Sequence, residues 1–72
     1  MIIGNMATLV KNLNDLKQMI GEKKVLINFF SGLSINTISL QNEYFIINCE
    51  WDFEILGELE RLRPNDLNIR LE

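Results

Sequence analysis

The amino-acid sequence predicts one small α+β domain over residues 1–72, an antiparallel sheet with two helices on one face. Two segments have the apolar spacing of helices, and the segments between and after them alternate with a period of two. No repeat, low-complexity stretch or linker interrupts this pattern. The expected order of elements is α-β-β-β-α-β, and runs of strands between helices are typical of α+β domains.

The first helix is expected over residues 6–20. Asn5 is a suitable N-cap, and Gly21 stands where a left-handed residue commonly ends a helix. The apolar residues with helical spacing are Leu9, Val10, Leu13, Leu16 and Ile20.

Three strands are expected next, over residues 23–31, 33–41 and 44–51. The sequence SGLS is a turn signal between the first two, and residues 41–43 fit a tight hairpin between the second and third. The alternation assigns one face, the expected core face, to Val25, Ile27, Phe29, Ile38, Leu40, Phe45, Ile47, Cys49 and Trp51.

The second helix is expected over residues 53–63, with Asp52 as its N-cap and Pro64 as its end. Gly57 costs about 1 kcal/mol relative to alanine inside a helix, which predicts that another group packs closely there. Residues 66–72 alternate again and predict a short, half-exposed edge strand.

The length limits how the fold is stabilised. A core in a domain of 72 residues contributes only about 3–5 kcal/mol net, so small domains often add a disulfide, a metal or a partner. One cysteine excludes an internal disulfide, and the absence of histidine removes the commonest zinc ligand. We therefore expect no metal, no cofactor and no small-molecule ligand. The fold is then stabilised either by association with a protein or by a core that is sufficient on its own.

Candidate catalytic groups lack the partners that catalysis needs. Cys49 has no histidine in the chain to activate it, and Glu50 beside it raises the pKa of a thiol. Glu50 and Asp52 could form an acid–base pair, but a chain this small has little room for a cleft, and Asp52 is better explained as a helix cap. The sequence predicts a protein that is not an enzyme.

Charge and hydropathy argue against nucleic acid and membrane. The net charge is −3, and the order of the first five expected elements is similar to that of double-stranded-RNA-binding domains. Those domains rely on a basic stretch at the start of their second helix, where this chain reads DFEILGELE.

No apolar run approaches the ~20 residues that span a bilayer, and the start, MIIGNMATLV, lacks the basic region of a signal peptide. With its free thiol, the chain is expected in the cytoplasm.

Two surfaces are candidates for binding. No charged residue occurs between Val25 and Asn42, although a sheet face open to water usually carries charge. The alternative is a surface with scattered apolar side chains, which is normal for a folded protein. The second candidate is the acidic block over residues 43–60, which has six acids and no Lys or Arg and could meet a basic patch on a partner. The same block is also consistent with a solvated helix face that keeps the protein soluble. The candidate partner-binding residues on the two surfaces are Leu26, Phe30, Ile35, Tyr44, Ile46, Glu50, Glu54 and Glu58.

These observations predict a non-enzymatic protein-binding module. An inhibitor or an immunity-type antagonist is one possible form, because such a protein needs only a stable surface. The partner is expected to be another protein or a second copy of the chain. The alternative is a structural subunit or homo-oligomer that assembles through the uncharged sheet face.

Overall fold

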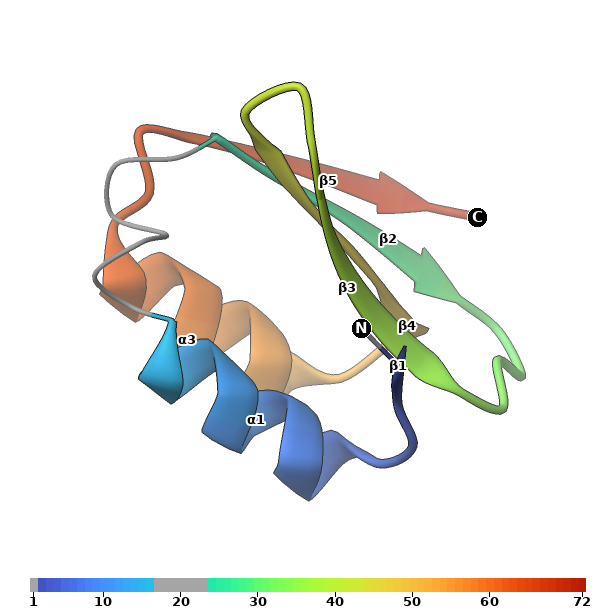
Figure 1. Ribbon diagram of the computed structural model, residues 1–72. Helices are drawn as coiled ribbons and strands as arrows, with labels where there is room; N and C mark the ends of the chain where they lie inside the picture. Colours follow the sequence, from blue (N-terminus) through green and yellow to red (C-terminus); the bar gives the residue numbers. More distant parts are fainter. Residues whose placement is uncertain (1, 17–23) are drawn as a thin grey trace.

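The computed structural model describes residues 2–16 and 24–72. Figure 1 shows two layers, a twisted sheet and a pair of helices that cover one of its faces. This confirms a small domain with two helices on one side of a sheet. In chain order the elements are β1 (Ile2–Ile3), α1 (Met6–Asp15), β2 (Lys24–Phe30), β3 (Asn36–Gln41), β4 (Tyr44–Glu50), α3 (Phe53–Leu62) and β5 (Asp66–Leu71).

The sheet is mixed, so the prediction of an antiparallel sheet is wrong. Its strand order is β1-β3-β4-β2-β5; β3 is antiparallel to β1 and β4, whereas β2 is parallel to β4 and to β5. β2 and β3 follow each other in sequence but are not neighbours, because β4 lies between them. Strands β2 and β4 have apolar residues on both faces, which suits the centre of a sheet. The two-residue alternation places side chains on a face but does not choose the neighbouring strand. The short strand β1 was not predicted.

The predicted hairpin is confirmed between β3 and β4. Gln41 pairs with Tyr44, and the two residues between them, Asn42 and Glu43, have φ values of 49° and 70°. Two-residue hairpin loops of this type need positive φ at both positions, which asparagine tolerates better than most residues.

Helix α1 begins at its predicted cap, where the backbone N–H of Thr8 donates to Asn5 Oδ1 over 2.8 Å. The helix ends at Asp15, earlier than predicted, and residues 17–20 and Gly21 of that prediction lie outside the described residues.

Helix α3 also begins at its predicted cap, where the N–H of Glu54 donates to Asp52 Oδ1 over 2.7 Å. Arg63 closes the helix in a left-handed conformation, with φ 49°, directly before Pro64. The predicted close packing at Gly57 is wrong, because a Cβ atom built there meets nothing within 4 Å.

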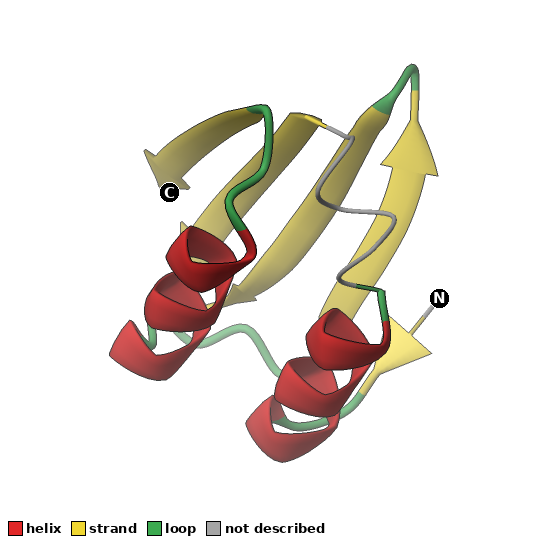
Figure 2. Ribbon diagram, turned by 90° about the vertical axis from the view of Figure 1, so that its left-hand side faces the viewer, coloured by secondary structure: helices red, strands yellow, loops and turns green. Residues whose placement is uncertain are grey.

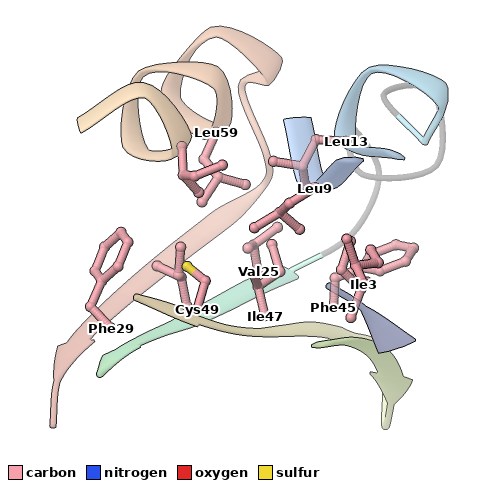
Figure 3. Close-up of a cluster of buried hydrophobic side chains, with 12 residues drawn as sticks. Ile3, Leu9, Leu13, Val25, Phe29, Phe45, Ile47, Cys49 and Leu59 are labelled. Atoms are coloured by element: carbon pink, nitrogen blue, oxygen red, sulfur yellow. The ribbon is translucent and has the colours of Figure 1, made fainter. Parts of the chain in front are cut away.

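The core lies between the helices and the sheet face that they cover. In Figure 3, Leu9, Leu13 and Leu59 of the helices point toward side chains of the strands. The predicted core positions of Leu40 and Trp51 are wrong, because their side chains are 51% and 42% exposed. Leu40 lies near the hairpin, beyond the part of β3 that pairs with β1. Strand β4 ends one residue before Trp51, and the chain turns there into α3. The buried core residues are Ile3, Leu9, Leu13, Val25, Ile27, Phe29, Ile38, Phe45, Ile47, Cys49, Ile55 and Leu59.

Over residues 2–16 and 24–72, neither helix has the length and apolar character needed to cross a membrane.

Candidate functional site

The sheet face turned away from the helices is open in the described part of the chain (Figure 1). We call this surface the sheet back. Its central side chains alternate with the core residues along β2 and β4 and are half-buried, whereas the core residues beside them are fully buried. The central side chains are Leu26, Asn28, Phe30, Tyr44, Ile46 and Asn48.

A row of polar side chains crosses the middle of the sheet back. Asn28 Nδ2 donates to Asn48 Oδ1 over 2.9 Å, and Asn48 Nδ2 donates to Thr37 Oγ1 over 3.1 Å. The row therefore links β2, β4 and β3 through side chains as well as through backbone. Asn28 Oδ1 is buried and has no hydrogen-bond partner among the described residues.

A shallow depression of about 410 Å³ lies beside this row. Its apolar lining comes from Leu26, Tyr44 and Ile46, three of the residues predicted to bind a partner. Leu26 and Ile46 are direct neighbours in the parallel pairing of β2 with β4. The polar lining is supplied by Gln41, Asn42, Asn68 and Arg70.

Tyr44 also has a cation near its ring. Lys24 Nζ lies 5.6 Å from the ring centroid, within the range of cation–π attraction. Lys24 and Tyr44 are direct neighbours in the register of β2 and β4, so the ring lies at the end of the depression where both strands begin.

Two further predicted residues lie at the other end of these strands. Phe30 and Glu50 are in-register neighbours and line a second depression of about 410 Å³, together with Trp51 and Leu71. Ile35 lies in the connection that leads to β3 and is 49% exposed. The structure thus spreads these residues along the sheet instead of joining them in one pocket.

The acidic residues of α3 form a separate surface. Glu54 and Glu58 belong to the helix layer, on the side of the sheet opposite to the sheet back. Glu58 forms an ion pair with Arg61, three residues further along the same helix. The predicted residues are therefore divided between two faces of the molecule, which could not be engaged together by one flat partner.

The only cysteine is buried and poorly suited to nucleophilic chemistry. Burial, and secondly the Asp52 carboxylate, raises the pKa of the Cys49 thiol from 9.0 to about 11. A thiol needs a lowered pKa to react at neutral pH. Among the described residues, no group of three or more acidic or thiol side chains is placed to hold a metal ion.

Sequence reasoning missed the polar row and the contribution of β5. The two asparagines have a visible signal, since they occupy the same place in two similar strands, VLINFF and FIINCE. Asn68 and Arg70 gave no comparable signal, because they reach the depression only through the parallel pairing of β5 with β2.

Fold and surface together define a small domain with a mixed sheet, one face covered by helices and the other open. In comparisons with known proteins, no family model, no curated protein and no solved structure matches the chain significantly.

Proposed function

We propose that this protein is a non-enzymatic binding module that docks on another protein through the sheet back. The observation that carries the proposal is the depression lined by Leu26, Tyr44 and Ile46 on a sheet face that no described element covers. The centres of protein interfaces are poor in charge and rich in aromatic residues; the apolar part of this lining carries no charge and includes the ring of Tyr44.

The surroundings of the depression support the same role. Arg70 and Asn68 provide polar groups at its margin, and interfaces commonly have a polar rim around an apolar centre. The polar row of Asn28 and Asn48 satisfies most of its own hydrogen bonds, so covering it with a partner leaves few polar groups without a bond. A protein that blocks a partner needs only a surface of this kind. We therefore propose that the binding module acts as an inhibitor or antagonist.

The acidic surface of α3 is secondary in this proposal. Glu58 is already engaged by Arg61, and charged groups at a rim mainly affect the association rate and its salt dependence. We expect replacing Glu54 and Glu60 by glutamine to reduce the salt dependence of partner binding while largely preserving its strength.

The test compares affinity capture by the wild-type protein with capture by Leu26→Glu. A carboxylate at position 26 introduces charge at the centre of the depression, while Lys24 and Arg70 on the same face help to accommodate it. Ala7→Glu is the matched control, because it makes the same change of charge on an exposed position of α1. We expect a partner retained by the wild type and by Ala7→Glu to be lost from Leu26→Glu.

Each bait is first checked for folding by circular dichroism and thermal melting. The proposal fails if the folded Leu26→Glu protein captures the same partner as the wild type. If the captured species is the chain itself and Leu26→Glu reduces the molar mass to that of a monomer, the sheet back is a self-assembly surface, the alternative raised by the sequence.

A further inference from the structure

Strand β5 has a free edge. It pairs with β2 on one side, and no other described strand pairs with its outer side (Figure 2). The N–H of Glu72 donates to the carbonyl of Phe29 over 2.8 Å, so even-numbered residues of this strand direct their backbone groups toward β2. The backbone groups of Leu67, Ile69 and Leu71 consequently point outward. An edge of six residues without proline is a template for another strand.

The side chains along this edge complement a second copy of themselves. In an antiparallel pair with its two-fold axis at Asn68, Leu67 stands opposite Ile69 of the second copy, and both direct their backbone groups at each other. The same register places Asp66 opposite Arg70 of the second copy, twice by symmetry. Opposite charges facing each other across strands stabilise a pair, and like charges destabilise it.

Other symmetric registers lose this complementarity. An axis at Ile69 places Asp66 opposite Glu72 of the second copy, and an axis at Arg70 places two arginines together. An axis at Leu67 shortens the pair and sets Arg70 opposite Pro64. Charge therefore selects the register centred on Asn68.

The side chains of β5 on the helix side of the sheet independently favour pairing with a second copy. Ile69 is 44% exposed and Leu71 is 74% exposed, on the side of the sheet where the helices lie. Pairing at the selected register sets Ile69 beside Leu67 of the second copy and removes part of this apolar surface from water.

We propose that β5 is a homodimerisation edge, at which two copies join antiparallel around Asn68 into one continuous sheet. The strand edge and the sheet back are different surfaces, so the sheet backs of both copies stay open in this dimer. The proposal does not depend on the proposed function.

The first test is molar mass by light scattering and sedimentation over a wide concentration range. The wild type is expected to reach twice the 8.4 kDa of the chain. Asp66→Arg and Arg70→Asp each place like charges together and are expected to weaken the dimer at least tenfold. The double variant Asp66→Arg/Arg70→Asp exchanges the charges and is expected to restore it. Leu26→Glu is expected to leave the dimer intact.

The second test fixes the register. Asn68→Cys places two thiols at the two-fold axis, at a pair position where Cα atoms are about 4.5 Å apart, within the range that a disulfide bridges. Oxidation is expected to crosslink this variant much faster than Ala7→Cys, an exposed position on α1 in the helix layer.

Three results would overturn the proposal. The first is a wild type that stays monomeric at every concentration, and the second is a double charge exchange that fails to restore the dimer. The third is a dimer that is lost in folded Leu26→Glu but kept in both single charge variants. Equal crosslinking of Asn68→Cys and Ala7→Cys would refute the register.

Discussion

The two faces of strand β2 differ although they alternate along the same seven residues. Val25 and Ile27 are fully buried under the helices, and Phe29 is 2% exposed. Their neighbours Leu26 and Asn28 have comparable positions on the other face but are only half-buried. What differs between the faces is the layer that covers them, since both helices lie on one side.

The covered face stabilises the fold, whereas the open face is available to a partner. The covered face contains almost no polar group, so its contribution comes from apolar area removed from water and from close packing. The open face combines apolar side chains with a polar row that bonds to itself across three strands. Such a face tolerates water and can also be covered by a partner.

The largest expected effect comes from shortening a side chain on the covered face. Ile47 is fully buried, and Ile47→Ala is expected to lower the free energy of unfolding by about 2–5 kcal/mol. Since a domain of this size has a net stability of about 3–5 kcal/mol, much of the variant should be unfolded at 25 °C. Urea titration followed by far-UV circular dichroism measures the loss.

Ile46→Ala is the matched control, because it makes the same change one residue earlier, on the sheet back. Ile46→Ala should lower the free energy of unfolding by less than half as much as Ile47→Ala. Equal losses at positions 46 and 47 would contradict the contrast between the faces.

Alkaline pH should lower the stability of the protein through the thiol of Cys49, which lies on the covered face. The folded protein holds this thiol at a pKa of about 11 against 9.0 for an unperturbed thiol, so the folded state retains the proton that the unfolded state releases. Stability is therefore unaffected below pH 9 and falls as the pH rises toward 11, by about 2–3 kcal/mol in total.

The measurement is the free energy of unfolding at several pH values between 8 and 11. Cys49→Ala has no thiol to titrate, so it should show a smaller fall than the wild type over this range. If both proteins lose stability in parallel, the buried thiol does not control the alkaline limit.

The open face depends on its polar row. Asn48→Ala removes the acceptor used by Asn28 and the donor used by Thr37, with an expected loss of about 1–3 kcal/mol. Replacing both asparagines by leucine removes donor and acceptor together and should restore part of that stability. Thermal melts at low protein concentration test the order of the variants, and a double variant less stable than Asn48→Ala would contradict it.

The smallest effect is a gain, on the outer side of the helix that closes the covered face. Gly57→Ala meets open space and removes the entropic cost of a glycine in a helix, so it should add about 0.5–1 kcal/mol and raise the Tm by a few degrees. Gly32→Ala is the control, because its φ of +77° disfavours a side chain and should lower the Tm. A fall in Tm for Gly57→Ala would show that this position is constrained.

Much of the local structure could be predicted from the sequence. Asn5 and Asp52 cap their helices as predicted, because a short polar side chain before an apolar helical pattern has a local hydrogen-bonding use. The β3–β4 hairpin was also predictable, since it depends on only two residues between strands. Leu26, Tyr44 and Ile46 were predicted to share a face, and the structure brings them together around one depression.

The sequence by itself determined the starts of the two helices, the four longer strands and which residues of β2 and β4 share the core face, because caps and periodicity act over a few residues. The tertiary structure alone decided that β4 lies between β3 and β2 and that β5 runs parallel to β2 as an edge strand. Strand neighbours depend on how the crossover helices pack over the sheet, which involves residues far apart in the chain. For that reason the margin of the depression at Arg70 and the self-complementary edge of β5 emerged only from the fold.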